Sequence, residues 1–263
     1  MDFVEIEYKE RDVNWAMSDL QSHDYYELYL LVDGKREFFF ENKVFNLTAP
    51  TFCVIPPFSM HKTSGGSYKR ININVSPALL TLREKKVLDE LSKGIAHPID
   101  FEQSVTISEL LKRGAKVSLA ETEEKQSLIL AFVHTALYLI ESAVKYDSVN
   151  SELIDKKRRD NTMLEVVSFI NENYKEPLTL KEISDNFYIS KNTLSSKFRA
   201  TMQCSVMEYL SFVRINRAKE LLSTTNMDME KISEECGYSS ANYFSLIFKN
   251  IVGLPPTSYR KSK

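Results

Sequence analysis

The chain carries one arrangement of aromatic and basic side chains twice, about fifty residues apart. Phe198-Arg199 is followed by Tyr209, eleven residues after the phenylalanine, and Phe248-Lys249 is followed by Tyr259 at the same offset. Guanidinium and ammonium groups bind phosphate oxygens. Two copies of a short helical unit, each ending in such a pair, predict two similar surfaces that contact one long repetitive partner. DNA is the obvious candidate.

The start of each repeated unit offers side chains that can recognise base edges. A side-chain amide can bond adenine in two places, hydroxyls are less selective, and basic groups contact phosphates. In the first copy we predict a DNA-contacting set of Lys191, Asn192, Ser195, Ser196, Lys197 and Arg199. In the second copy the corresponding set is Ser240, Asn242, Tyr243 and Lys249. Any exposed helix has polar residues on one face, so the duplication carries more weight than either set alone.

A second group of residues, near the N-terminus, could bind a small molecule or a metal ion. His23, Glu27 and His61 offer two imidazoles and a carboxylate, which are transition-metal ligands. Polar groups beside aromatic rings also suit a sugar or another polar metabolite. We predict an effector pocket without metal or cofactor, formed by His23, Tyr25, Glu27, Tyr29, His61 and Arg70. Satisfied structural polar residues are the alternative.

The segment that carries these pocket residues, 23–75, has the pattern of short strands. Alternation over 23–32 places Glu27 and Tyr29 on one face and Leu28 and Leu30 on the other. Asp33-Gly34 predicts a hairpin turn. Many short strands with turns between them predict a small barrel or sandwich. The phenylalanines at 38–40, 45, 52 and 58 permit an apolar effector such as a fatty acid, although such residues more often form a barrel core.

From residue 76 the hydrophobic period becomes that of helices, the longest of which is expected over 121–146. Its apolar stripe consists of Leu128, Ala131, Phe132, Thr135, Leu139 and Ala143. Such a stripe packs a helix on its own domain or joins two copies of the chain, and the two roles are compatible.

Residues 147–160 are polar and charged, which marks them as a linker between a domain of residues 1–146 and a helical domain of residues 161–263. The basic run 156–159 could touch phosphates but is more typical of a solvated linker. Residues 161–263 carry 13 basic and 11 acidic groups, a net charge of +2, while the whole chain has a net charge of −2. DNA binding must therefore depend on local placement of charge.

Composition narrows the class of protein. No apolar run approaches twenty residues, and the N-terminus lacks a basic region followed by an apolar core, so we expect a cytoplasmic protein without a membrane span. Cys53, Cys204 and Cys236 are odd in number and lack paired metal spacing, as expected of reduced thiols. No serine lies in a Gly-flanked elbow and no nucleophile-base set is evident, so we expect no enzyme.

Many residues of the last hundred match one known pattern. They include the segments 180–184, 194–199 and 214–218, with Gly237-Tyr238, Tyr243-Phe244, Phe248-Lys249, Gly253 and Tyr259-Arg260. Through them, residues from about 162 to 261 resemble the C-terminal DNA-binding domain of the AraC/XylS family. The resemblance implies two helix-turn-helix units, joined by a rigid helix, that dock in successive major grooves on one face of DNA.

The resemblance also implies which side chains read bases. These are Asn192, Ser195, Ser196, Asn242 and Leu246. Gln203 stands where the family usually has glycine, which alters a turn. Leu246 stands where relatives often have a basic or polar residue, so the second unit is expected to read bases weakly, by contact with a thymine methyl group. Its main expected role is that of a backbone clamp.

The N-terminal segment resembles the cupin-like sensory domain that this family often carries, through His23, Glu27, Gly34, Pro56-Pro57 and His61. The close histidine pair of cupin enzymes is absent. The resemblance implies an α+β protein: an N-terminal cupin-like β-barrel with dimerisation helices, then a C-terminal all-α domain with two helix-turn-helix units.

The function expected from this resemblance is that of a ligand-responsive transcription regulator. It would be homodimeric and an activator, with double-stranded DNA, a sugar or other small polar metabolite, and RNA polymerase as partners. Three alternatives stay open: an apolar effector, a metal-dependent cupin enzyme fused to a DNA-binding module, and a regulator controlled by a protein partner.

Overall fold

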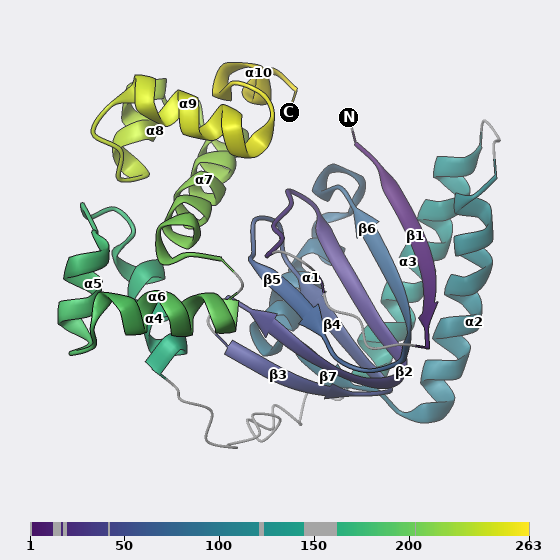
Figure 1. Cartoon of the computed structure of the whole chain (residues 1–263). Helices are drawn as coiled ribbons and strands as arrows, with labels where there is room; N and C mark the ends of the chain where they lie inside the picture. Colours follow the sequence, from purple (N-terminus) through teal and green to yellow (C-terminus); the bar gives the residue numbers. More distant parts are fainter. Residues whose placement is uncertain are drawn as a thin grey trace. The chain divides into compact units, whose positions relative to one another are not determined.

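Figure 1 shows the computed structural model of the chain, which describes residues 2–12, 17, 20–41, 43–120, 124–144, 162–202 and 204–262. Two compact units make up the molecule, one mainly of residues 23–155 and the other mainly of residues 156–263. The predicted α+β class is confirmed, since the first unit combines an antiparallel sheet with helices and the second is helical. The predicted linker 147–160, both of its boundaries, its basic run and Gln203 lie outside the described residues.

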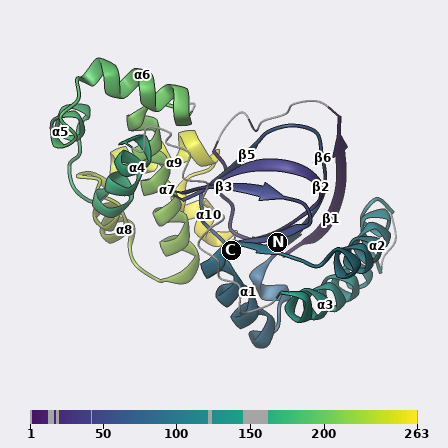
Figure 2. The ribbon, with the colours of Figure 1, turned by 90° about the horizontal axis from the view of Figure 1, so that it is seen from below.

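Antiparallel strands form the sheet of the first unit. In the described part of the chain they are β1 Val4–Arg11, β2 Tyr26–Phe40, β3 Lys43–Thr48, β4 Thr51–Ile55, β5 His61–Ser64, β6 Tyr68–Val75 and β7 Ala96–Pro98. The order across the sheet is β1-β6-β2-β4-β7, and β3 and β5 pair with the second half of β2. Figure 2 shows these strands curling around a common interior.

The two faces of β2 enter different cores, as its alternating sequence predicts. Tyr29 and Leu31 belong to the buried cluster inside the curled sheet, together with Phe38. Leu28 and Leu30 belong to the cluster between the sheet and its helices. Successive side chains of a strand point to opposite faces. Glu27, two residues before Tyr29, is therefore directed into the interior with it.

The predicted hairpin turn at Asp33-Gly34 is wrong, because β2 continues through this dipeptide as one strand of 15 residues. The strand bends there instead: its register with β6 shifts after Leu31, and Gly34 has a φ of +95°. A Cβ atom at Gly34 would collide with the carbonyl oxygen of Ser67, so the bend requires glycine. The bend brings the rings of Tyr29 and Phe38 to 6.0 Å across the interior.

Helices cover the outer face of the sheet. After a short 3₁₀ turn at Pro77–Leu79, these are α1 Leu82–Gly94, α2 Phe101–Ser118 and α3 Lys125–Ala143. α1 begins at a capping box in which Thr81 and Glu84 each accept a backbone N–H of the other. α2 and α3 lie side by side and pack on β1, as Figures 1 and 2 both show. α2 has no counterpart among the sequence predictions.

The packed face of α3 is not the predicted stripe. Its buried residues include Ile129, Val133 and Ile140, whereas Leu128 is 47% exposed and Ala143 is the one fully buried member of the predicted set. α3 is apolar on more than one side, so periodicity could not choose the packed face. Among the described helices, α3 alone has the length and composition that crossing a membrane requires, and its packing on α2 and β1 gives its apolar residues a partner within the protein.

The second unit consists of helices in its described part. They are α4 Thr162–Asn173, α5 Leu180–Asn186, α6 Lys191–Met202, α7 Val206–Thr224, α8 Met229–Glu235, α9 Ala241–Val252 and α10 Pro256–Lys261. Several of them begin at local caps: Thr179 and Glu182 form a capping box on α5, Asp228 caps α8 and Ser240 caps α9. α5 with α6 and α8 with α9 form the two predicted helix-turn-helix units.

Candidate DNA-binding helices and effector site

The first helix-turn-helix unit joins the seven-residue α5 to the twelve-residue α6 through a tight turn. Tyr188 adopts a left-handed conformation, with a φ of 52°, and the next N–H bonds to the Ser184 carbonyl at 3.1 Å. Ser190 then accepts the backbone N–H of Thr193 at 3.1 Å, which starts α6. This reversal lets the two helices cross while the first turn of α6 stays exposed.

The second unit repeats this construction with helices of the same lengths, seven residues in α8 and twelve in α9. Gly237 takes the left-handed position with a φ of 76°, and the Tyr238 N–H bonds to the Ser233 carbonyl at 2.9 Å. Ser240 starts α9. The turn between the helices spans five residues here and four in the first unit, as the helix bounds show.

The duplicated sequence pattern describes the core of each unit. Phe198 and Tyr209 are buried, and their rings meet edge to face at 5.6 Å and 74°. Phe248 and Tyr259 are buried and repeat the contact at 5.5 Å and 72°. Edge-to-face pairs are a favoured aromatic geometry. The aromatic members therefore hold the helices together, and only the basic members, such as Arg199, reach the surface.

α6 presents its predicted DNA-contacting residues on the side opposite its core. Leu194, Phe198 and Met202 are buried at four-residue spacing. Of the predicted set, Ser195 is half-buried and the rest are exposed, namely Lys191, Asn192, Ser196, Lys197 and Arg199. Ser196 donates to the Thr193 carbonyl at 3.2 Å. Arg199 lies 4.0 Å from the Glu208 carboxylate, a contact loose enough for phosphate to replace.

α9 presents a more apolar outer face. Phe244 and Phe248 are buried, and the predicted residues Ser240, Asn242, Tyr243, Leu246 and Lys249 are exposed. Leu246 is 55% exposed and Tyr243 is 56% exposed. The predicted residues within α9 thus offer one amide, one phenol and one ammonium group around an exposed leucine, which is a poorer set for direct base contacts than that of α6.

Side chains that the sequence analysis did not assign a role connect the two helix-turn-helix units. Arg214 of α7 donates from Nε to the Tyr174 carbonyl at 2.8 Å and from Nη2 to the Glu176 carbonyl at 2.7 Å. Lys175 pairs with Glu235 of α8 at 2.6 Å. The segment after α4 is therefore tied to α7 and α8, which restrains the angle between α6 and α9. Arg214 and Lys175 are not part of an apolar pattern, so the sequence contains no signal for this role.

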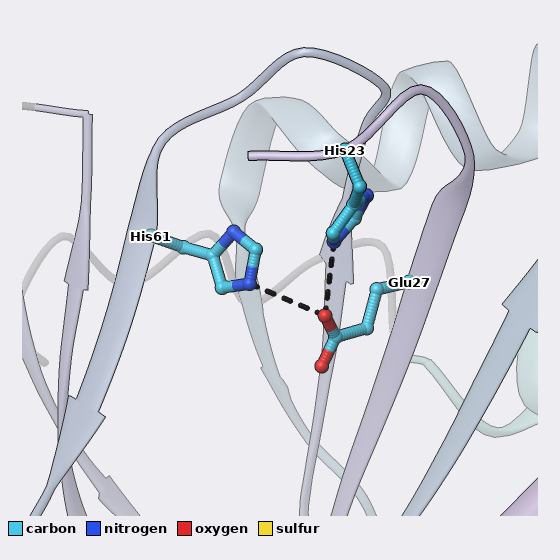
Figure 3. A group of neighbouring side chains, drawn as sticks. All are labelled: His23, Glu27 and His61. Atoms are coloured by element: carbon cyan, nitrogen blue, oxygen red, sulfur yellow. Dashed lines mark hydrogen bonds and ion pairs between the residues drawn. The ribbon is translucent and has the colours of Figure 1, made fainter. Parts of the chain in front are cut away.

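In the N-terminal unit, which carries the β-sheet, three predicted pocket residues converge at one point (Figure 3). His23 precedes β2, Glu27 lies in β2, and His61 begins β5. The Nε2 atoms of His23 and His61 lie 3.0 Å and 3.2 Å from the same oxygen, Oε2 of Glu27. The three side chains are 10%, 2% and 12% exposed for His23, His61 and Glu27. This group, the His23–Glu27–His61 cluster, is the one set among the described residues whose spacing suits a metal ion.

The carboxyl of Glu27 is held in its ionised form. Burial by itself would raise its pKa, but hydrogen bonds and ion pairs with His23 and His61 outweigh burial and keep the pKa well below its usual range. The amide nitrogen of Asn72 donates to the other oxygen, Oε1. Asn72 is missing from the predicted pocket, although its place opposite Tyr29 in β6 directs it inward and the alternation of 70–75 carries that signal.

The other predicted pocket residues adjoin this cluster. The ring of Tyr25 stacks on the imidazole of His23 at 3.9 Å, and burial with the Glu27 charge raises the pKa of Tyr25 to about 12. Tyr29 shares the inward face of β2 with Glu27. The Arg70 guanidinium lies 5.9 Å from the Tyr29 ring and pairs with Glu7 at 2.8 Å, while its Nη1 is buried without a hydrogen-bond partner.

Arg36 is a further interior cation that the sequence analysis missed. Its guanidinium lies 4.4 Å above the Tyr68 ring and donates to the Thr63 hydroxyl at 3.3 Å. Burial lowers its pKa. Arg36 lies two residues from Phe38 and so shares the inward face of β2. The interior thus joins an anionic end at Glu27 to a cationic end at Arg36 and Arg70.

The fold, with its two helix-turn-helix units, is that of a DNA-binding regulator, and comparison with known proteins agrees. Residues 183–262 match the family described as a helix-turn-helix domain, and residues 3–127 match the AraC-like ligand binding domain. Together these two matches cover most of the chain. The chain belongs to the AraC/XylS family of transcriptional regulators.

Individual relatives match this chain over different lengths. An uncharacterized HTH-type transcriptional regulator, YijO of Escherichia coli, is 26% identical over 60% of this chain and 58% of its own length. The lactose operon transcription activator of Staphylococcus xylosus is 23% identical over 89% of this chain and 82% of its own length. The chain spans about half the length of the first two curated relatives it matches, at 58% and 50%.

Among solved structures, the C-terminal domain of AraT, a response regulator from Geobacillus stearothermophilus, is 27% identical. It covers 39% of this chain and 85% of its own, with a TM-score of 0.38.

Proposed function

We propose that this protein regulates transcription in response to a small polar effector, which binds inside the first unit and changes how the second unit engages double-stranded DNA. The observation that carries the proposal is the pair of helix-turn-helix units, each with a seven-residue and a twelve-residue helix and the same buried aromatic pair. Such units place their second helix in the major groove.

The two units divide the work of recognition. α6 reads bases with Asn192, Ser195 and Ser196, because an amide can bond adenine in two places and hydroxyls add weaker contacts. Lys191, Lys197 and Arg199 bind phosphates beside it. α9 serves mainly as a clamp on the backbone, where Lys249, Ser240, Asn242 and Tyr243 contact phosphates and sugars and Leu246 meets a thymine methyl group.

The effector is a sugar or another small polar metabolite. The support is an interior that sets the His23–Glu27–His61 cluster and Arg70 beside the rings of Tyr25 and Tyr29, since hydroxylated ligands need both hydrogen-bonding groups and flat apolar surfaces. One relative with high coverage is a lactose operon activator. The phenylalanines that would serve an apolar effector are largely committed elsewhere, because Phe38 and Phe45 are buried in the interior core.

The regulator works as a cytoplasmic homodimer and as an activator. Dimerisation is supported by α3, where Leu128, Ala131 and Thr135 of the predicted stripe stay exposed while Phe132 and Leu139 pack on the core of their own unit. An exposed apolar patch often marks a docking surface for another protein chain. Activation implies a contact with RNA polymerase by the DNA-bound form.

Selection of binding sites from a random DNA pool by the full chain tests the DNA-binding proposal directly. The result expected is one enriched sequence that retains protein at salt concentrations where random DNA is released. Enrichment of no sequence would contradict it. A thermal-shift screen against sugars, other polar metabolites and fatty acids then tests the effector: stabilisation by a fatty acid alone would replace the polar effector by the apolar one.

A further inference from the structure

Hydrogen bonds on the far side of both imidazole rings orient the two histidines of the His23–Glu27–His61 cluster toward Glu27. His23 Nδ1 lies 2.9 Å from the Tyr25 carbonyl oxygen, and His61 Nδ1 lies 3.3 Å from the Ser59 carbonyl oxygen. A carbonyl only accepts, so each Nδ1 carries the ring proton. Both Nε2 atoms then face Glu27 Oε2, at 3.0 Å and 3.2 Å. Three atoms of the kinds that bind transition metals therefore converge from separate segments of the chain.

We propose that the cluster binds a divalent transition-metal ion through His23 Nε2, His61 Nε2 and Glu27 Oε2. Two imidazoles and a carboxylate are ligands that such an ion takes, and the site is shielded from water, since the His61 side chain is only 2% exposed. His61 Nε2 is buried without a hydrogen-bond donor or acceptor of good geometry, as a ligand atom awaiting a metal would be.

The spacing of the atoms fits metal coordination. Ligand atoms bonded at roughly 2.1 Å to one metal lie about 3.0 Å apart at a right angle and about 3.4 Å apart at a tetrahedral angle. Two edges of the cluster already measure 3.0 Å and 3.2 Å. The third, between the ligand atoms of the two histidines, is at most 4.8 Å.

The surrounding contacts are those that orient metal ligands. Metal-bound histidine usually donates its second N–H to a carbonyl or carboxylate, which both rings already do. Asn72 fixes the carboxylate through Oε1, and the Tyr25 ring fixes the plane of His23 by stacking at an interplanar angle of 3°. These partners come from the residue before β2, from β6 and from the loop before β5, so the site is held by the sheet and the segments that border it.

The ligand set selects the class of ion and leaves it open to a ligand. Two imidazoles with one carboxylate suit Zn²⁺, Fe²⁺, Co²⁺ or Ni²⁺ rather than Mg²⁺ or Ca²⁺, which prefer oxygen. Three protein ligands leave at least one coordination position free, and a hydroxyl or carboxylate of the effector would fill it. This regulatory part rests on the proposed function, whereas metal binding by the cluster does not.

Metal binding is measured on the full chain without a histidine tag, after removal of metals with a chelator. Titration with Co²⁺ should give one ion per chain with visible absorption bands, and Zn²⁺ should displace it. His61→Gln and Glu27→Gln should weaken binding at least ~100-fold, and Asn72→Ala, which only removes an orienting bond, by about 10–100-fold. His134→Gln is the matched control, because His134 also contacts a carboxylate, Glu84 at 2.6 Å, but outside the cluster.

No Co²⁺ bound by the folded, unaltered chain would overturn the metal site, and so would binding by Glu27→Gln as tight as that of the unaltered chain. Circular dichroism checks that each variant is folded; if one is not, the Co²⁺ titration of the unaltered chain decides. DNA affinity, measured with and without the ion, tests the regulatory part. Equal affinity in the presence of stoichiometric metal would overturn that part alone, and absence of DNA binding with metal bound would overturn the proposed function alone.

Discussion

At the scale of residues, identical sequence signals serve two purposes in this chain. Phe198 and Phe248 mark the repeat because each must pack edge to face on a tyrosine eleven residues later. Their basic neighbours, Arg199 and Lys249, are exposed and available to phosphate. The aromatic residues of the motif therefore stabilise the fold, whereas the basic residues are available to bind a partner. Only the burial of the side chains distinguishes these two roles.

Asn192→Ala should weaken binding to the selected DNA site by roughly 1–3 kcal/mol and relax the preference at one base pair, if its amide makes the two-point contact with adenine. Quantitative binding to the site and to its single-base variants measures both effects. Asn250→Ala, at an exposed asparagine near the end of α9, is the matched control and should leave the preference intact. Equal losses on specific and random DNA would contradict the reading role of Asn192.

Lys249→Ala should lower the slope of log affinity against log salt by about 0.9, because one phosphate contact and its released counterion are lost. The measurement is a salt titration of binding to the selected site. Lys93→Ala, on the exposed surface of α1 in the other unit, should leave the slope unchanged. A slope that Lys249→Ala does not alter would remove Lys249 from the phosphate contacts.

At the scale of elements, the two helix-turn-helix turns solve one problem with different residues. Both need a left-handed residue after a seven-residue helix, Tyr188 in one and Gly237 in the other. Tyr188 is 97% exposed, so its side chain meets no obstacle. A Cβ at Gly237 would lie 2.6 Å from the Tyr174 carbonyl oxygen, because the segment after α4 passes close to this turn.

Gly237→Ala should therefore destabilise the second unit by roughly 1–3 kcal/mol, since the left-handed strain is joined by a steric clash. Tyr188→Ala keeps the same backbone strain without a clash and should change stability by less than about 0.5 kcal/mol. Chemical denaturation of both variants measures the difference. Equal stabilities would mean that the two turns are under the same constraint.

The helices and strands also show which features of the fold could be predicted from the sequence. Helix starts were predictable because caps such as Thr179, Asp228 and Ser240 are local signals. Asp33-Gly34 was misread because the same dipeptide serves a hairpin or a strand bend, and only the pairing of β2 with four other strands decides between them. The face of α3 was misread because a helix that is apolar on more than one side contains no local signal of which side meets the sheet.

The candidate sites likewise differ in how much of each could be predicted from the sequence. The polar face of α6 could be read from the spacing of Leu194 and Phe198, which fixes what lies opposite. The convergence of His23, Glu27 and His61 was suggested by residue type alone, and its geometry required the bend of β2. Arg36, Asn72 and Arg214 were not found, because their roles depend on strands and loops distant in sequence.

At the scale of the whole molecule, the proposed function requires that one chain contact both a second copy and DNA. Leu128 is 47% exposed on α3, and the Thr135 hydroxyl is satisfied by the Ala131 carbonyl at 2.8 Å, which leaves this face apolar. Burying such a face between two copies is favourable at about 25 cal/mol per Å².

Leu128→Glu should shift the chain toward monomer, because it places a charge in the proposed interface. Sedimentation over a range of concentrations measures the shift. Leu82→Glu, at the 86% exposed start of α1, is the matched control and should leave association unchanged. A dimer that tolerates Leu128→Glu would move the interface away from this face of α3.

The central claim is that both helix-turn-helix units of one chain enter DNA. Base-by-base interference mapping of the full chain on its selected site measures this most directly. We expect each chain to contact two major-groove segments about 10 base pairs apart on one face of the duplex. We further expect strong base dependence at the segment bound by α6 and weak base dependence at the segment bound by α9. A single contacted segment per chain, or two segments on opposite faces, would contradict the central claim.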